Sequence, residues 1–118
     1  MRTALIVSAG LAGLSSIALA AADIPTRYSG AFPSIGRATN ITGTFTGNAL
    51  ALRYTVVRPE GPSTYEGQYA CRTKSSSASR CDGRWTNVRT GFSGRNGVDI
   101  RWKAGKPTYF HIDKPKRS

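Results

Sequence analysis

Bulky apolar and polar residues alternate along most of the chain after residue 22, and no stretch there repeats apolar residues at the spacing of a helix. A period of two is typical of strands, in which every second side chain points to the same face. One design recurs: a bulky residue, a glycine and a second bulky residue at alternate positions, in segments 28–32, 41–45, 65–69 and 81–85. The pattern predicts an all-β fold whose glycines and aromatic residues share the inward face.

Two hairpins set the expected strand registers. One has a two-residue turn at Gly47 and Asn48, and the other places Cys71 directly across from Cys81. These turns predict the following opposite pairs: Phe45 and Leu50, Gly43 and Leu52, Ile41 and Tyr54, Tyr69 and Gly83, Gly67 and Trp85. Each aromatic side chain of the second hairpin then covers a glycine on its neighbour, which permits strong strand curvature.

The remaining turn signals complete a meander. The Pro- and Gly-rich stretch 58–63 is expected to be a loop that pairs Val56 with Tyr65, which sets Leu52 beside Tyr69. A three-residue turn is expected at 95–97, followed by a strand at 98–103 and a last strand at 108–112. The count is seven or eight short antiparallel strands. Because inward glycines favour coiling, we predict a small closed or nearly closed barrel.

The first 22 residues have a different character. A basic start at Arg2 precedes an apolar run, and small residues follow at Ala18, Ala20 and Ala22. This pattern is typical of a cleaved secretory signal peptide. We expect a bacterial periplasmic or extracellular protein with a signal peptide at 1–22, one β-barrel domain at 23–113 and a basic tail at 114–118. No transmembrane segment is expected after cleavage.

Cys71 and Cys81 are the two cysteines of the chain. In an oxidising compartment two cysteines ten positions apart favour a disulfide, since no third cysteine or nearby histidine completes a metal site. We therefore expect a disulfide, no metal site and no cofactor.

The charge of the chain is strongly positive. Seventeen Lys and Arg residues face six Asp and Glu residues, giving a formal net charge of +11. Arginine predominates, which suits bidentate contact with phosphate, sulfate or carboxylate groups. The expected registers place Arg53, Gln68 and Arg84 in one outward row, continued by Thr42. The remaining candidate anion-binding residues are Arg101 and Lys103 beside Asp99, and Lys74 and Arg80 in a flexible hairpin tip at 74–80.

This surface favours a non-catalytic binding or envelope-associated protein. The expected partner is an anionic envelope or extracellular polymer: an acidic glycan, lipopolysaccharide or a lipid headgroup. Nucleic acid ranks lower because its binding sites interleave basic residues with exposed aromatic ones, and most aromatic residues here are predicted to face inward. We expect the inward Tyr28, Tyr54, Tyr69, Trp85 and Trp102 to form the core rather than line a ligand cavity.

Two alternatives stay open. The order Glu66, Arg84, Arg89, His111 resembles the Glu, Arg, Arg, His order of small secreted microbial ribonucleases, which implies RNA cleavage with His111 as the acid. The stretch from Ser93-Gly94 to Trp102-Lys103 resembles the signature of periplasmic inhibitors of C-type lysozyme, which are small disulfide-bonded barrels. That resemblance implies a protein partner contacted by Ser93 and Lys103.

Overall fold

A computed structural model describes residues 23–34, 36–113 and 116–117, and none of these residues lies in a helix. The expected signal peptide at 1–22 falls outside the described residues, as do 114, 115 and 118 of the expected basic tail. The strands are β2 (Tyr28–Ala31), β3 (Ala38–Phe45), β4 (Ala49–Arg58), β5 (Gly61–Ser75), β6 (Ala78–Asn87), β7 (Ser93–Lys103), β8 (Lys106–Ile112) and β9 (Lys116–Arg117).

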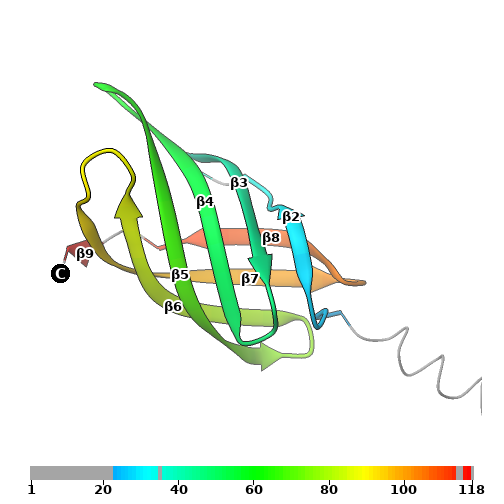
Figure 1. The fold of residues 1–118 in the computed structure, drawn as a ribbon. Helices are drawn as coiled ribbons and strands as arrows, with labels where there is room; N and C mark the ends of the chain where they lie inside the picture. Colours follow the sequence, from blue (N-terminus) through cyan, green and yellow to red (C-terminus); the bar gives the residue numbers. More distant parts are fainter. Residues whose placement is uncertain (1–22, 35, 114–115, 118) are drawn as a thin grey trace, which may run out of the picture.

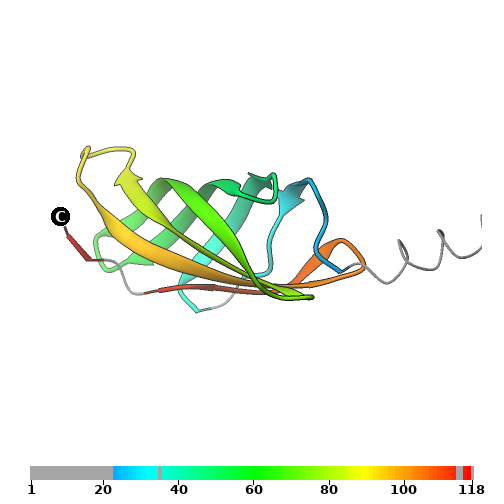
Figure 2. The ribbon, with the colours of Figure 1, turned by 90° about the horizontal axis from the view of Figure 1, so that it is seen from below.

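The strands form one antiparallel meander in chain order from β2 to β8, and β9 pairs with the start of β7. The sheet curls into a nearly closed barrel (Figure 1), which Figure 2 shows from below. The predicted fold class is therefore confirmed. Within the described part of the chain, no helix of the length and apolarity needed to cross a membrane is found.

The glycine and aromatic design works as the sequence predicts. Tyr69 lies opposite Gly83 and Gly67 lies opposite Trp85. A β-carbon on Gly83 would lie 2.0 Å from the backbone oxygen of Gln68, so the two strands approach too closely there for a side chain. Glycines at these positions let long strands bend around the core.

Four of the five predicted core residues, Tyr54, Tyr69, Trp85 and Trp102, are buried, whereas Tyr28 is half-buried and packs against them. The core is one cluster. Its ring contacts include Phe45 with Trp102, a stacked pair of Tyr54 and Tyr65, and Trp85 edge-on to Tyr65. Burial raises the pKa of the Tyr54 and Tyr69 hydroxyls, so both stay neutral.

Side chains complete the barrel where the sheet ends. No strand pairing joins β2 to β8 among the described residues. Phe32, just after β2, contacts the rings of Tyr28, Trp102 and Phe110 at centroid distances of 5.3, 6.3 and 5.0 Å. We call these four residues the aromatic seam. Nearby, Asp23 accepts backbone hydrogen bonds from Ala104 and Gly105 in the β7–β8 turn, which fixes the start of the described chain.

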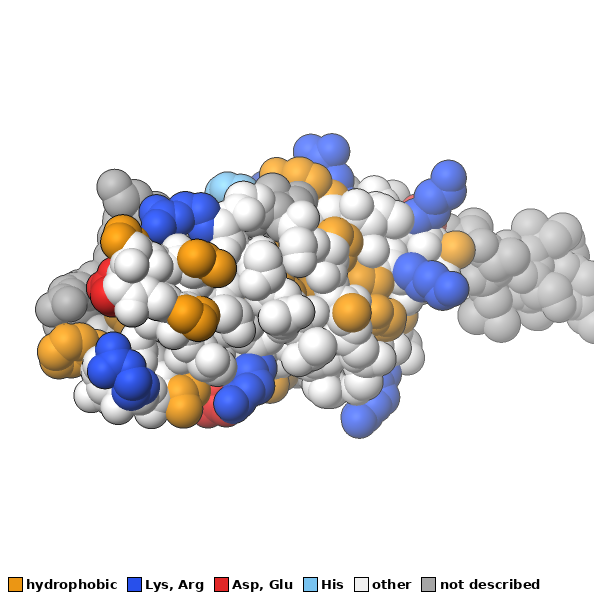
Figure 3. Space-filling view, turned by 90° about the horizontal axis from the view of Figure 1, so that it is seen from above, with side chains coloured by type: hydrophobic (Ala, Val, Ile, Leu, Met, Phe, Trp, Pro, Cys, Tyr) orange, Lys and Arg blue, Asp and Glu red, His pale blue; other side chains and the backbone are white. Residues whose placement is uncertain are grey.

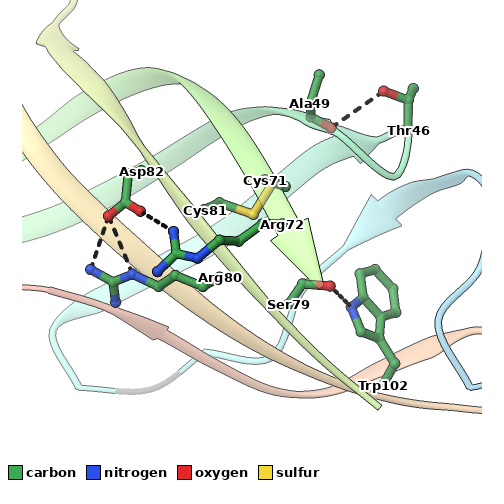
Figure 4. Close-up of a disulfide and its surroundings, with 9 residues drawn as sticks. All are labelled: Thr46, Ala49, Cys71, Arg72, Ser79, Arg80, Cys81, Asp82 and Trp102. Carbon is green, nitrogen blue, oxygen red and sulfur yellow. Dashed lines mark hydrogen bonds and ion pairs between the residues drawn. A yellow bond between two sulfur atoms is a disulfide. The ribbon is translucent and has the colours of Figure 1, made fainter. Parts of the chain in front are cut away.

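The disulfide is confirmed: Cys71 and Cys81 lie directly opposite each other on β5 and β6 and are joined. Figure 4 shows it beside Arg72, Arg80 and Asp82, with the indole of Trp102 donating to Ser79 from the barrel interior. The bridge closes a loop of only ten positions.

The structure corrects two predicted registers and one predicted turn. Val56 pairs with Ser63, not with Tyr65, because the β4–β5 turn contains only Pro59 and Glu60 and the predicted loop is mostly strand. This shift of two residues leaves every side chain on its predicted face but changes its neighbour.

The second correction concerns β3. The predicted pairs of Phe45 with Leu50 and Gly43 with Leu52 are confirmed, but a β-bulge between Thr39 and Thr42 interrupts the ladder before Ile41 reaches Tyr54. Asn40 takes a positive φ of 52° at this bulge. The extra residue keeps Ile41 buried on the inward face.

The third correction has the largest consequence for the surface. The predicted turn at 95–97 is instead the middle of β7, and the connection from β6 is residues 88–92. Asn87 builds that turn, because its side-chain oxygen accepts hydrogen bonds from the backbone of Arg89 and Thr90. The predicted last strand at 108–112 is confirmed but begins two residues earlier, at Lys106.

Candidate anion-binding groove

An open groove of about 480 Å³ lies on the outer face of the barrel where β6 pairs with β7. Two of its lining positions are glycines, Gly83 and Gly97, and Gly97 is buried beneath neighbouring side chains. Arginine and aspartate side chains form the walls. The lining residues are Arg80, Asp82, Gly83, Arg84, Arg95, Asn96, Gly97 and Asp113.

Two exposed arginines stand directly opposite each other at one end of this groove. Arg84 on β6 pairs with Arg95 on β7. Opposite residues in an antiparallel pair have β-carbons about 5 Å apart, so both long side chains can reach the same group. An anion placed between the two guanidinium groups can accept hydrogen bonds from both.

The row of positions extends across four strands. Gln68 on β5 lies opposite Arg84, and Lys116 on β9 lies opposite Arg95. Neighbouring strands are about 4.8 Å apart, so the register places Gln68, Arg84, Arg95 and Lys116 within roughly 15 Å. Gln68, Arg84 and Arg95 in one line suit a ligand that carries several anionic groups.

The other wall of the groove is an ion-pair cluster around Arg80. Its guanidinium donates to Asp99 at 3.0 Å, to Asp82 at 3.1 Å and to Asp113 at 2.7 Å. The side chain is only 21% exposed. The hydrogen bond to Asp113 contributes most to raising the pKa of Arg80, and burial opposes it. Arg80 is therefore a permanent cation with its charge already neutralised.

Asp82 has a second partner, since Arg72 donates to its other carboxylate oxygen at 2.9 Å. Both arginines converge on this carboxylate in Figure 4. Burial alone would raise the pKa of Asp82, but the hydrogen bonds from Arg72 and Arg80 outweigh it and lower the pKa. Asp82 stays ionised and holds Arg80 in place.

Gly97 makes the cluster possible. A β-carbon at this position would lie 2.0 Å from Nη2 of Arg80 and 2.8 Å from Oδ1 of Asp82. The guanidinium of Arg80 thus lies directly over the backbone of β7. Asp113 is bound there as well, because its backbone nitrogen donates to the carbonyl oxygen of Gly97. The cluster fixes the end of the barrel from which the chain continues to β9.

Histidine and two carboxylates meet at the edge of the cluster. Ligand atoms of Asp99, His111 and Asp113 lie within 4.8 Å of one another. Both carboxylates already bind the Arg80 guanidinium, and Nδ1 of His111 lies 3.6 Å from Oδ1 of Asp113. We assign the two carboxylates to positioning Arg80.

Only some of the predicted anion-binding residues lie in the groove. Arg84 lies in the groove, as does Arg80, but Arg80 belongs to β6 rather than to a flexible hairpin tip. Arg53 does not join the row with Gln68: the register shift places it opposite Glu66, with which it forms an ion pair.

The other predicted basic residues lie away from the groove. Arg101 and Lys103 share the outward face of β7 with Asp99, as expected, and the guanidinium of Arg101 lies 5.1 Å from the ring centroid of Tyr109. Lys74 is exposed near the end of β5. Figure 3 shows Lys and Arg side chains spread around the face seen from above.

Sequence reasoning missed Arg95 and Lys116. The Asn-Gly pair after Arg95 is a strong turn signal, and it removed Arg95 from the predicted strand. Continuing the alternation of 98–103 backward through residue 93 would have found it, since Arg95 then shares the face of Asp99 and Arg101. Lys116 carries no comparable signal, because β9 is only two residues long.

The residues of the two family resemblances do not converge. Glu66 on β5 and His111 on β8 are separated in the sheet by β6 and β7, and Glu66 is paired with Arg53. Measured along the curled sheet, three strand spacings, roughly 14 Å, separate the two positions. Ser93 and Lys103 lie at opposite ends of β7.

The chain matches no known protein-family model, and no curated protein and no solved structure shows significant similarity to it.

Proposed function

We propose that this is a small secreted bacterial protein that binds anionic groups of the cell envelope or its surroundings through the Arg84–Arg95 groove, without catalysing a reaction. The opposed arginines carry this proposal. Both side chains are exposed and line an open groove, so an anion can reach both guanidinium groups at once. Phosphate, sulfate and carboxylate groups all match a pair of guanidinium forks.

The distribution of the carboxylates supports the proposal. Asp82, Asp99 and Asp113 are gathered around Arg80, and Glu66 is paired with Arg53. Four of the six acidic residues are therefore held in ion pairs, while the chain carries seventeen Lys and Arg residues. A surface with a net charge of this size attracts polyanions over long range, and the groove adds a place for specific contact.

Export is part of the proposal. The signal-like pattern of 1–22 supports it, and the disulfide is compatible with an oxidising compartment. The abundant anions in that setting are lipopolysaccharide phosphates, acidic glycans and lipid headgroups.

The test is binding of the oxidised protein to inorganic polyphosphate, lipopolysaccharide and an acidic glycan at physiological salt, measured by calorimetry. The variant Arg84→Gln/Arg95→Gln is expected to bind at least about tenfold more weakly, because two charge-assisted contacts are lost. The control Arg53→Gln/Arg101→Gln removes the same charge elsewhere and is expected to keep most of the affinity. Equal losses in both variants would overturn the groove as the site.

A further inference from the structure

Apolar exposure is concentrated at one end of the barrel. Among the described residues the exposed large apolar side chains are Val57, Val88, Phe92 and Tyr109. Tyr109 lies on β8, but the other three flank the β4–β5 and β6–β7 turns. Because the sheet is a meander, these two turns lie at the same end, at the upper left of Figure 1. We call this the apolar end.

A similar dipeptide lies at each turn. Val57-Arg58 ends β4, whereas Val88-Arg89 begins the β6–β7 turn, and all four residues are exposed. Val57 and Phe92 are both 57% exposed and Val88 is 48% exposed. The β6–β7 turn lies beside the first part of β5, since the backbone nitrogen of Val88 donates to the carbonyl oxygen of Thr64.

The opposite end of the barrel is different in kind. Its turns consist of small or polar residues: Thr46, Gly47 and Asn48 in one, Ser76 and Ser77 in the next, and Ala104 and Gly105 in the third. Basic residues lie at both ends: Lys74, Lys103 and Arg101 lie near these turns, whereas Arg37, Arg58 and Arg89 lie near the apolar end. The two ends therefore differ in the apolar character of their turns.

The apolar end is continuous with the groove. Val88 and Arg84 lie on the same outward face, four residues apart on β6 and its extension. That spacing corresponds to about 13 Å along a strand. Apolar side chains of peripheral proteins enter a membrane by about 5–10 Å, with basic residues at the level of the phosphates. At the apolar end, apolar side chains therefore come first and basic side chains follow farther along the strand, in the same order as the acyl region and the phosphates of a membrane.

We propose that the apolar end docks on an anionic phospholipid bilayer, with Val88 and Phe92 entering the headgroup boundary while Arg89, Arg84 and Arg95 contact lipid phosphates. This inference rests on the proposed function, because it names headgroup phosphate as the anion of the groove. Charge complementarity selects this occupant: at the apolar end Arg37, Arg58 and Arg89 outnumber the one carboxylate of the two turns, Glu60, and the surface of an anionic bilayer is negative.

The test is sedimentation of the oxidised protein with vesicles of phosphatidylcholine alone or mixed with phosphatidylglycerol. Binding is expected to the mixed vesicles only. The variant Val88→Ser/Phe92→Ser is expected to bind them roughly tenfold more weakly, since it loses apolar contact with the bilayer. Tyr109→Ser, which removes an exposed aromatic residue away from this end, is expected to match the unaltered protein. Both variants change exposed residues, and near-ultraviolet circular dichroism checks their folding.

Soluble polyphosphate separates this inference from the proposed function. The Val88→Ser/Phe92→Ser variant is expected to keep polyphosphate binding, because Arg84 and Arg95 remain. Binding of the unaltered protein to polyphosphate but not to mixed vesicles would overturn membrane docking and leave the groove in place. Unchanged vesicle binding by the variant would also overturn it. Absence of binding to every anion would instead refute the proposed function.

Discussion

Gly97 shapes the candidate site because it has no side chain, which leaves room for the guanidinium of Arg80. The β-carbon of an alanine at position 97 would lie 2.0 Å from Arg80 Nη2, within the space of the guanidinium. We expect Gly97→Ala to displace the guanidinium and lower the free energy of unfolding by about 1–3 kcal/mol. Urea denaturation measures this loss.

The matched background for that variant is Arg80→Gln. Without the guanidinium, the clash at position 97 is smaller, so Gly97→Ala is expected to cost less in this background than in the unaltered protein. Equal costs in the two backgrounds would show that Gly97 is needed for another reason.

The pH dependence of stability follows from Asp82. Its pKa in the folded protein is lowered from 3.8, so the ionised form is favoured by folding. The resulting stability is fully present above the unfolded-state pKa and is lost as pH falls through the lower folded-state pKa. We expect the unaltered protein to lose stability below about pH 4. In Arg80→Gln this acid-dependent loss should be smaller, as measured by urea denaturation at several pH values; an identical pH profile would contradict the role of Arg80.

At the scale of the elements, the disulfide joins β5 and β6 at directly opposite positions of their hairpin. Closing so short a loop stabilises the fold by about 3 kcal/mol in the chain-entropy model. Dithiothreitol is expected to lower the urea midpoint of the unaltered protein by the corresponding amount. A Cys71→Ala/Cys81→Ala variant should start at the lower midpoint and not respond to dithiothreitol. A midpoint that ignores reduction in the unaltered protein would refute this contribution.

The elements also show which parts of the fold the sequence can predict. Alternation and the glycine positions predict which face each side chain takes, because a one-residue slip would expose the core. They do not distinguish registers two residues apart, since both bury the same face. That is why the sequence predicts Arg53 in one row with Gln68, whereas the structure places it opposite Glu66.

Turn chemistry is misleading where tertiary contacts outweigh it. The Asn-Gly pair at 96–97 predicts a hairpin turn, yet both residues lie inside strand β7. Asn96 accepts a hydrogen bond from the Tyr69 hydroxyl at 2.9 Å, and Gly97 gives room to Arg80. Neither partner is near in sequence, so the candidate groove could not be predicted from local signals.

At the scale of the whole molecule, the barrel depends on side chains for its closure. The aromatic seam bridges β2 to β7 and β8, where the described strands make no backbone pairing. Phe32 is its central residue and is almost fully buried.

The seam predicts how the barrel opens. Phe32→Ala is expected to lower the free energy of unfolding by about 3–5 kcal/mol, because it leaves a cavity between three other rings. Amide hydrogen exchange should accelerate most in β2 and β8, at the two sides of the seam, and less in β5 and β6 at the centre of the sheet. Tyr109→Ala, on the outer face of β8, is the control and should change exchange little. Should Phe32→Ala not fold, Phe32→Leu tests the same pattern with a smaller cavity. Uniform acceleration over all strands would mean that the barrel opens as one unit, and the seam would then be core rather than closure.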